Sequence, residues 1–392
     1  MALSLMHRTI NNALLRKEEG TSNVYGDVLP IQARNDNVRP VHHASSAQVT
    51  PNDHDVAFCT DKVIMAYELI CAALDVALPR GANKHKVLRG TGIFEDAISP
   101  DIRINIKQYI TLLENIQIQT KGNDISFLIG GALANTIAKR QIYAYADSDV
   151  ELLNIDNVLS QLLNNVQFKW RLFPLIVFRE FRIERRLLLV AETTVINTKL
   201  KQFVVEMAYA TLYGLLKNTA GRRIPLAFTF RANRPRNIAD FETHLGLNIS
   251  FSMLTNSISL NTESLAMPLA IHQRDCPNKG SCIQGISDKA KSPILLTDYI
   301  RNAIYLNDTG QAVSADKLNI SAATLKRKLK EFGTSFRILS EEVQFHQAVV
   351  LLSLAQLSNE QAAHAMHISD LPNFRRTVKR LTGKTPSELR AK

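Results

Sequence analysis

One supersecondary pattern occurs twice near the C-terminus, and this repeat limits what the chain can fold into. The first copy begins at Ala315 and the second at Ala363, an offset of 48 residues that becomes 49 from Leu325 and Phe374 onward. A repeat with a one-residue insertion indicates one structural unit used twice. In each copy an apolar residue follows the small residue at i+3, so both fall on one face of a helix.

The residues after this first helix predict a tight turn and then a second helix. Asn319 stands where the turn needs a left-handed residue, which Asn tolerates better than most, and His367 takes the matching place in the second copy. Ser321 and Ser369 are predicted to be the N-caps of the second helices, because serine accepts hydrogen bonds from unpaired N–H groups there. Each copy is therefore predicted to be a helix-turn-helix.

The second helix of the first copy combines a buried apolar face with an exposed basic face. Leu325 and Leu329 are expected to point inward, whereas four of the five positions from Lys326 to Lys330 are basic. Residues 308–392 contain 13 Lys or Arg against 8 Asp or Glu, within a chain of net charge +11. This excess favours a polyanionic partner such as nucleic acid. An ordinary amphipathic helix pair is the alternative for one copy alone, but two matched copies favour DNA binding.

Four stretches of the last hundred residues or so follow a characteristic order: Ser321 to Leu329, Gly333-Thr-Ser-Phe336, Ala348 with Leu351-Leu352, and Phe374 to Arg390. With these stretches the segment resembles the C-terminal domain of AraC/XylS-type transcription regulators. That family has two helix-turn-helix units joined by a long helix, which the resemblance places at Phe336 to Leu354. His367-Ile368 departs from the usual Gly-Phe of the family, and Gln344 from a common Arg.

The resemblance also implies which residues contact DNA. Arg and Lys can bind guanine O6 and N7 in the major groove, and Asn can pair with adenine. Lys330, Lys379 and Arg380 are expected to contact phosphates, which fix the register without reading sequence. Ion pairs within the domain are the alternative for Arg327 and Arg376. The positions on the exposed first turns of the two recognition helices, expected roughly 34 Å apart, are Ala322, Ala323, Lys326 and Arg327 in the first unit, and Leu371, Pro372, Asn373, Arg375 and Arg376 in the second.

Upstream of residue 270 the apolar periodicity switches repeatedly between helical and strand-like, which predicts a mixed α and β fold. Apolar residues recur at helical spacing in the ranges 63–74, 105–117, 127–139, 150–163, 200–217 and 238–245. Short apolar runs bounded by turn residues predict strands at 173–178, 182–190, 225–230, 249–254 and 257–260.

Three stretches in this region carry a second, more diffuse resemblance: Leu88-Arg-Gly-Thr-Gly-Ile93, Phe230-Arg-Ala-Asn-Arg-Pro235, and Phe241 to Gly246. Between about Val63 and Pro268 the chain resembles the effector domain of one branch of AraC-type regulators, often described as arabinose-binding-like. The resemblance implies a ligand-sensing domain but does not make arabinose the ligand. The two glycines of the first stretch lack the Lys-Ser/Thr ending of a phosphate-binding loop.

The expected architecture is an α+β effector domain followed by an all-α DNA-binding domain with two helix-turn-helix units. We expect a flexible N-terminal arm over residues 1–60, an effector-sensing and dimerisation domain over 61–270, a linker over 271–292, and the double helix-turn-helix domain over 293–392. The chain has no apolar run of about 18 residues that predicts a membrane span and no signal-peptide pattern. A cytoplasmic protein without membrane partners is expected.

No pattern in the sequence predicts catalysis, a cofactor or a metal. The motifs of hydrolases, metalloproteases and nucleotide-binding loops are missing, so we do not expect an enzyme. Glu341 and Glu342 are adjacent carboxylates, but a solvated helix face is the favoured explanation. His272, Asp275, Cys276 and Cys282 are candidate zinc ligands, yet the two cysteines have five residues between them, outside the two to four of common structural sites. Four cysteines are also too few for a secreted disulfide framework.

These observations lead to the hypothesis of a DNA-binding transcription regulator. Its expected partners are double-stranded promoter DNA, a small-molecule effector, RNA polymerase and a second copy of the chain in a homodimer. Alternatively, the N-terminal domain serves only as an oligomerisation or protein-interaction module. A defined apolar pocket with a few converging polar groups would favour ligand sensing. A flat, self-complementary patch would favour the interaction module.

Overall fold

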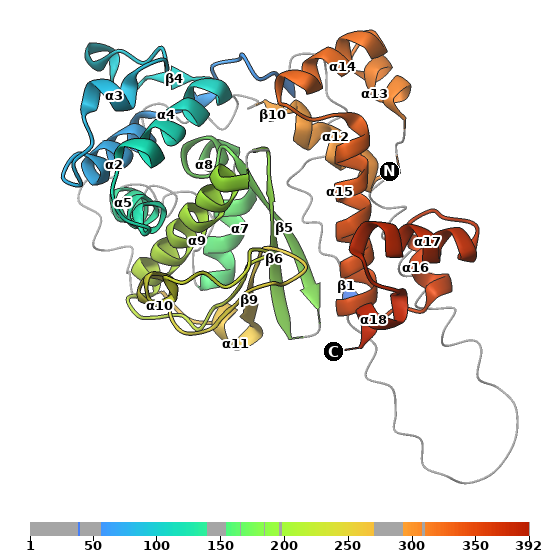
Figure 1. Ribbon diagram of the computed structural model, residues 1–392. Helices are drawn as coiled ribbons and strands as arrows, with labels where there is room; N and C mark the ends of the chain where they lie inside the picture. The colour runs from blue at the N-terminus through green and yellow to red at the C-terminus, as the bar shows by residue number, and fades with distance from the viewer. Residues whose placement is uncertain are drawn as a thin grey trace, which may run out of the picture. The chain divides into compact units, whose positions relative to one another are not determined.

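The structure is a computed structural model that describes residues 38–39, 56–138, 154–164, 166–183, 185–195, 198–269, 293–307 and 310–391 (Figure 1). The chain divides into an N-terminal unit, Pro51–Arg179 with Leu187–Leu296, and a C-terminal unit, Thr297–Lys392 with Met1–Thr50 and Glu180–Arg186. Most of the predicted arm, the whole predicted linker 271–292 and its two cysteines lie outside the described residues.

A mixed sheet forms one layer of the N-terminal unit, although its strand β1 and the residues of β5 and β6 within Glu180–Arg186 are grouped with the C-terminal unit. Its strand order is β1-β5-β6-β9-β7-β8, and β7 pairs antiparallel with β9 but parallel with β8. Phe228 in β7 lies opposite Ile258 and Ile249 in the two neighbouring strands. The strands are β1 (Val38–Arg39), β5 (Ile176–Ile183), β6 (Arg186–Thr193), β7 (Ala227–Thr229), β8 (Ile249–Ser250) and β9 (Ser257–Asn261).

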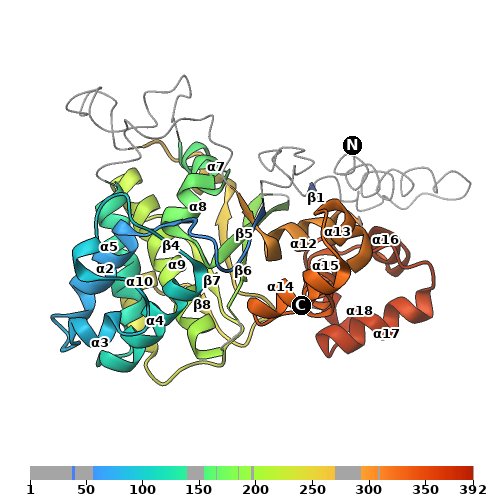
Figure 2. The same cartoon turned by 90° about the horizontal axis from the view of Figure 1, so that it is seen from above.

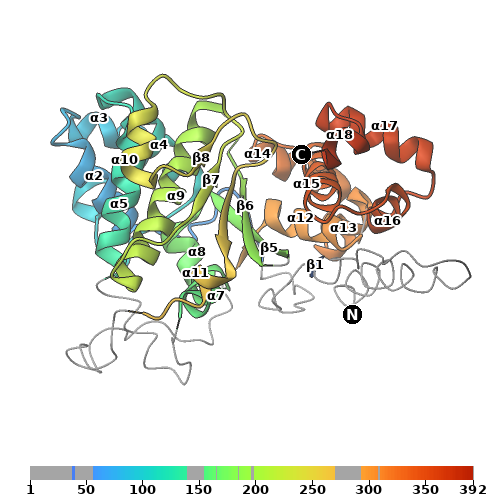
Figure 3. The ribbon, with the colours of Figure 1, turned by 90° about the horizontal axis from the view of Figure 1, so that it is seen from below.

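Helices cover this sheet in two further layers. In Figure 1, helix α9 lies between the sheet and α5, and Figures 2 and 3 show the same order from above and from below. The buried Tyr209 of α9 donates a hydrogen bond from its hydroxyl to the Thr229 carbonyl of β7, at 3.3 Å. The helices are α2 (Tyr67–Ala77), α3 (Lys84–Leu88), α4 (Ile106–Gln119), α5 (Ile125–Ala138), α7 (Ile155–Asn164), α8 (Val166–Leu172), α9 (Thr198–Ala220), α10 (Ile238–Leu245) and α11 (Thr262–Leu265).

The short elements complete the N-terminal unit. Strand β2 (Val56–Ala57) pairs parallel with β10 (Ile294–Leu295), and β3 (Ile64–Met65) pairs antiparallel with β4 (Arg103–Ile104). Glu95–Ala97 forms a short 3-10 helix. In the Leu88–Ile93 turn the Thr91 hydroxyl donates to the Leu88 carbonyl at 2.7 Å and accepts from the Ile93 N–H at 3.0 Å. This turn therefore satisfies its own polar groups, as expected of a structural turn rather than a phosphate-binding loop.

Small residues bring α5 and α9 close together. A Cβ atom on Gly130 would collide with the Met207 carbonyl and lie 2.8 Å from the Ala210 Cβ, and one on Gly214 would lie 2.7 Å from the Ala134 Cβ. The contacts advance along both helices in the same direction, so α5 and α9 run parallel at their interface. A larger side chain at position 130 would separate these helices.

The C-terminal unit is helical throughout its described part from residue 297 onward. Residues Val350–Leu354 extend α15 by one π-helical turn, so the long helix predicted over Phe336 to Leu354 is present with an irregular last turn. Figure 1 shows α13 and α14 beside one end of α15, and α16 to α18 beside the other. The helices are α12 (Leu296–Tyr305), α13 (Gln311–Lys317), α14 (Ala322–Glu331), α15 (Phe336–Val349), α16 (Asn359–Ala365), α17 (Leu371–Thr382) and α18 (Pro386–Arg390).

The predicted fold class, α+β followed by an all-α part with two helix-turn-helix units, is confirmed. Several strand boundaries were wrong. The strand predicted at 173–178 begins at Ile176, whose N–H closes a turn onto the Phe173 carbonyl at 3.1 Å, and the strand predicted at 182–190 begins at Arg186, since Arg182 belongs to the end of β5. The strand predicted over 249–254 ends at Ser250, since Ser252 takes a left-handed φ of 57°.

Candidate nucleic-acid interface and ligand pocket

The first helix-turn-helix is formed by α13, α14 and the turn between them. Asn319 has the left-handed φ of 51° that its position predicted, and the Ile320 N–H donates back to the Ala315 carbonyl at 3.0 Å. Ala315 is 1% exposed, so the small side chain lies in the helix contact. Ser321 caps α14, with its Oγ accepting from the Thr324 N–H at 3.1 Å. The predicted turn and cap of the first unit are confirmed.

The second helix-turn-helix repeats the same backbone bond. His367 takes a left-handed φ of 56°, and the Ile368 N–H donates to the Ala363 carbonyl at 2.9 Å. The predicted cap of this unit was wrong, because Asp370 and not Ser369 caps α17, accepting from the Asn373 N–H at 3.0 Å. The one-residue insertion of the repeat falls here, so Ser369 remains in the turn.

The predicted DNA contacts lie on the outer faces of the two recognition helices. Leu325, Leu329, Phe374 and Val378 are fully buried on the opposite faces, each with 0% exposure. Leu371 is half-buried at the start of α17. The exposed residues of the predicted set are Ala322, Ala323, Lys326, Arg327, Lys330, Asn373, Arg375, Arg376 and Lys379. Both helices thus present these side chains to solvent, as contact with a base edge requires; the assignment to DNA stays a prediction.

The basic side chains of the C-terminal unit differ in whether they form an ion pair within the unit. Within its described residues, Arg327 and Arg376 form no ion pair, so the alternative role as internal ion-pair partners has no support there. Arg376 Nε donates a hydrogen bond to the Pro372 carbonyl at 3.4 Å. Arg380 is different, because its Nη1 lies 2.9 Å from Glu341 Oε1 on α15. Hydrogen bonds from Arg337 and Arg380 lower the pKa of Glu341. Arg380 is thus engaged with the connecting helix.

The expectation of a merely solvated helix face was wrong for Glu342, whereas Glu341 lies among exposed side chains. Glu342 Oε2 accepts hydrogen bonds from Nη2 and Nε of Arg301, at 2.9 and 3.2 Å. Arg301 is 3% exposed and also contacts Asp298 at 3.2 Å within α12. A buried guanidinium needs such partners, and the pairing ties α12 to α15.

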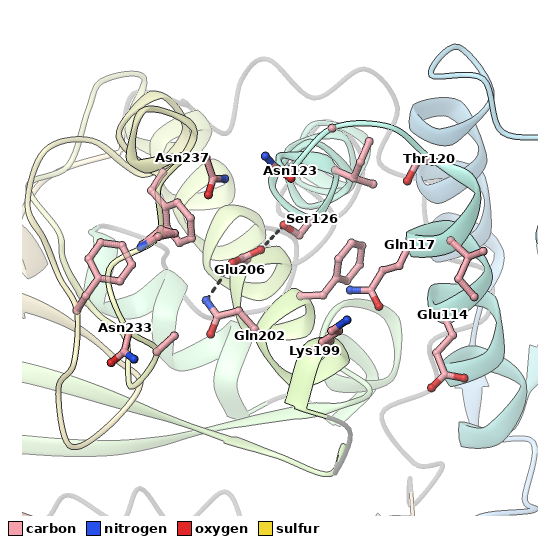
Figure 4. Close-up of a pocket in the computed structure, with 18 residues that line it drawn as sticks. Glu114, Gln117, Thr120, Asn123, Ser126, Lys199, Gln202, Glu206, Asn233 and Asn237 are labelled. Carbon is pink, nitrogen blue, oxygen red and sulfur yellow. Dashed lines mark hydrogen bonds between the residues drawn. The ribbon is translucent and has the colours of Figure 1, made fainter.

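A pocket in the N-terminal unit is the second candidate site. Its volume is about 680 Å³, and its walls come from α4, α5, the start of α9, the 232–237 segment and two phenylalanines, Phe241 and Phe251. Figure 4 shows Glu206 near the centre of the labelled side chains, with Gln117 of α4 and Thr120 directly after α4 on one side, and Asn233 and Asn237 on the other. A cavity of this size is typical of small-molecule sites, and ten of its eighteen lining residues are polar.

Glu206 is the buried carboxyl group of this pocket, with 8% exposure. Ser126 Oγ of α5 donates to its Oε2 at 2.6 Å, and Gln202 Nε2 donates to its Oε1 at 2.9 Å (Figure 4). Burial raises the pKa of Glu206, and the hydrogen bonds from Ser126 and Gln202 offset part of that rise. Position 206 was not predicted as a site residue, although a single charge between Lys201 and Lys217 in an apolar helix is a recognisable signal.

Aromatic rings pack against one another along one wall of the pocket. Phe241 and Phe251 both line it, and their ring centroids lie 5.2 Å apart in an edge-to-face arrangement. Phe230 stacks on Phe251 at 5.4 Å and meets Phe241 edge-on at 5.3 Å. These three rings come from β7's end, α10 and the segment after β8, so the wall depends on tertiary packing.

The described residues hold neither a metal cluster nor a membrane-spanning helix. Across the stretches that the structure describes, no group of three or more His, Cys, Asp or Glu is arranged to hold a metal. Cys276 and Cys282 lie outside those stretches. In the same stretches no helix has both the length and the apolar character needed to cross a bilayer.

A known protein family matches the C-terminal part of the chain. Residues 314–392 match a family model described as a helix-turn-helix domain. The chain is similar to the ornithine utilization regulator of Pseudomonas aeruginosa, with 25% identity over 197 residues that cover 48% of this chain and 57% of that protein. The chain therefore spans little more than half the length of this relative.

A structural similarity is weaker. The crystal structure of the transcriptional regulator CdpR from Pseudomonas aeruginosa aligns with a TM-score of 0.32 and 15% identity, covering 72% of this chain and 90% of that one. A likeness at this level carries no argument about fold or function.

Proposed function

We propose that this chain is a sequence-specific DNA-binding transcription regulator of the AraC/XylS type, controlled by a small-molecule effector in its N-terminal unit, because residues 314–392 match a helix-turn-helix domain model. The observation that carries the proposal is the pair of helix-turn-helix units with matching turn bonds, Ile320 to Ala315 and Ile368 to Ala363. Each unit has a capped recognition helix whose outer face is basic and exposed. Two such helices suit adjacent major-groove segments of one duplex.

The pocket around Glu206 supports the effector part of the proposal. Its volume of about 680 Å³ suits a metabolite, and its polar groups converging around a buried carboxyl group support ligand sensing over a pure interaction module. A ligand that binds one arrangement of the chain more tightly shifts the population toward it, and DNA affinity follows that population. The relative's name makes ornithine a reasonable first compound to test on this chain.

Binding of the full chain to double-stranded DNA tests the proposal. Duplexes selected from a random pool are compared with unselected duplexes of equal length over a salt series. We expect the selected sequence to be preferred by 10³-fold or more, roughly the lower range for specific regulators. Equal affinity for all duplexes with a steep salt slope would show that the basic faces act only electrostatically.

Two further partners belong to the proposal. A second copy of the chain and RNA polymerase are expected at a promoter, and sedimentation of the chain with and without its selected duplex checks the first. Pull-down of purified polymerase on the same duplex checks the second.

A further inference from the structure

The pocket of the N-terminal unit has a buried carboxyl group that no described cation neutralises. We propose that this pocket selects a ligand with an ammonium or guanidinium group on an apolar body, and that Glu206 receives the cationic group. This inference rests on the proposed function, because it names the chemical class of the effector.

The hydrogen bonds of Glu206 leave room for such a ligand. Ser126 and Gln202 each donate one bond, to different oxygens, whereas an ionised carboxylate accepts about four. Both donors are neutral, and among the described residues Glu206 has no ion-pair partner. Ser126 and Gln202 therefore hold the carboxyl group in place without satisfying its charge.

Burial makes this arrangement costly until a cation arrives. A carboxylate that is removed from water without a counter-charge is strongly destabilised, and burial accordingly raises the pKa of Glu206. A ligand ammonium or guanidinium would supply the counter-charge and donate to the remaining acceptor sites. An anionic ligand group at the same place would meet a like charge or force the carboxyl group to stay protonated.

The remaining lining fits the rest of such a molecule. Phe203, Phe241 and Phe251 offer ring surface for an apolar body, and ring faces attract cations as well. Asn233 and Asn237 provide neutral donors and acceptors on one side (Figure 4). Glu114 and Lys199 also line the pocket, where Glu114 is half-buried and Lys199 is exposed.

Three probes with one phenyl-and-four-carbon frame and a cationic, neutral or anionic end group test this selectivity: 4-phenylbutylamine, 4-phenylbutan-1-ol and 4-phenylbutanoate. Their binding to the full chain is measured by calorimetry and by the shift of the unfolding temperature, which rises with ligand occupancy. We expect the amine to bind most tightly and the carboxylate most weakly. Failure of the amine to bind, or tighter binding of the carboxylate, would overturn the proposal.

The variant Glu206→Gln separates charge from shape, because it keeps the size of the side chain and one acceptor oxygen. We expect the amine Kd to rise at least about tenfold in this variant, with little change for the alcohol. The control Glu114→Gln removes the other lining carboxylate and should change the amine Kd much less. An amine Kd that is unchanged in Glu206→Gln sinks the assignment even if the pocket binds the amine.

DNA binding distinguishes failure of this inference from failure of the proposed function. If the chain prefers its selected duplex but Glu206→Gln leaves amine binding intact, only the ligand class is wrong. If the amine binds through Glu206 but does not change DNA affinity, the ligand class stands and effector control fails.

Discussion

The two helix-turn-helix units share a backbone but differ in how the recognition helix is held. In both, an N–H after the left-handed residue closes the turn onto an alanine carbonyl. The first unit has Asn319 in the turn and Ser321 as the cap, and the second has His367 and Asp370. The closing bond therefore tolerates changes in the residues around it, whereas the cap moves with the inserted residue.

The recognition helices also differ in whether an exposed cation is paired with the connecting helix. Helix α17 is joined to the connecting helix α15 by the ion pair between Arg380 and Glu341. Among the salt bridges of the described residues none involves an exposed cation of α14 in the predicted contact set. We infer that the second recognition helix commits one exposed cation, Arg380, to the connecting helix, while each helix presents three exposed cations of the predicted set to DNA: Lys326, Arg327 and Lys330 on α14, and Arg375, Arg376 and Lys379 on α17.

The largest effect is expected from removing the core side chain that anchors each recognition helix. Phe374→Ala should destabilise the chain by about 3–5 kcal/mol and Leu325→Ala by about 2–5 kcal/mol, because both residues are fully buried. Chemical denaturation of the full chain, followed by circular dichroism, measures both. A loss below about 1 kcal/mol for either variant would mean that its helix is not anchored as described.

The next largest effect is expected at the exposed arginines. Arg327→Ala and Arg376→Ala should each weaken specific DNA binding by about 1–3 kcal/mol, since each is predicted to contact a base. Titration of the selected duplex at fixed salt measures this change, with Arg337→Ala on α15 as the control arginine. If one unit responds and the other does not, only the responding unit reads sequence.

Substitution of the cap residues should lower stability, and in the second unit the sensitive position should be the one displaced by the inserted residue. Ser321→Ala and Asp370→Ala should each cost about 1 kcal/mol of stability, because each removes a hydrogen bond to the first turn of a recognition helix. Ser369→Ala is the matched control and should be nearly neutral. Equal losses for Ser369→Ala and Asp370→Ala would contradict the displaced cap.

Lys379 and Arg380 are neighbouring cations on α17, and their substitutions should change the salt dependence of DNA binding by different amounts. Lys379→Gln should reduce the salt slope of DNA binding by about 1, as expected for one lost phosphate contact. Arg380→Gln should reduce it less, because Arg380 is already paired with Glu341. Affinity measured from low to high salt gives both slopes, and a larger change for Arg380→Gln would show that DNA breaks the ion pair.

The smallest effect concerns the turn histidine. Local desolvation and the charge of His364 lower the pKa of His367, so the unfolded chain binds the proton more readily. Stability should therefore be complete above the unfolded pKa of about 6.5 and fall slightly as pH drops through it. Denaturation at pH 7.5 and 5.5 measures the loss, which His367→Asn should reduce. The first unit, with Asn319, has no corresponding titration.

Local chemistry explains what the sequence could predict. The turn at Asn319 and the cap at Ser321 depend on residues a few positions apart, so their side chains suffice to place them. Asp370 was missed because the repeat was aligned on its serines, and the insertion moves the cap by one residue. The ion pair of Arg301 with Glu342 joins residues 41 positions apart, and no local pattern brings them together.

The pocket could not be predicted either, because its walls come from segments that are far apart in the sequence. Its walls combine α4, α5, α9 and the 232–237 segment, whose contact depends on the packing of the whole N-terminal unit. The carboxyl group of Glu206 accepts a hydrogen bond from Ser126, which lies 80 residues earlier in the chain. The unusual charge in α9 marked a buried group, but only the fold shows what surrounds it.

The parallel contact of α5 and α9 has a consequence for how this protein can change over evolutionary time. Ser126, Gly130 and Ala134 follow one another on one face of α5, and they meet Glu206, Ala210 and Gly214 in the same order on α9. The glycine positions set the spacing of the helices, and the polar pair at the head of the series belongs to the pocket. The positions that set the helix spacing and the positions proposed to set the ligand preference are therefore different residues along one helix contact. A lineage, or an engineer building a biosensor, can retune positions 126 and 206 for a new compound while leaving 130 and 214 untouched.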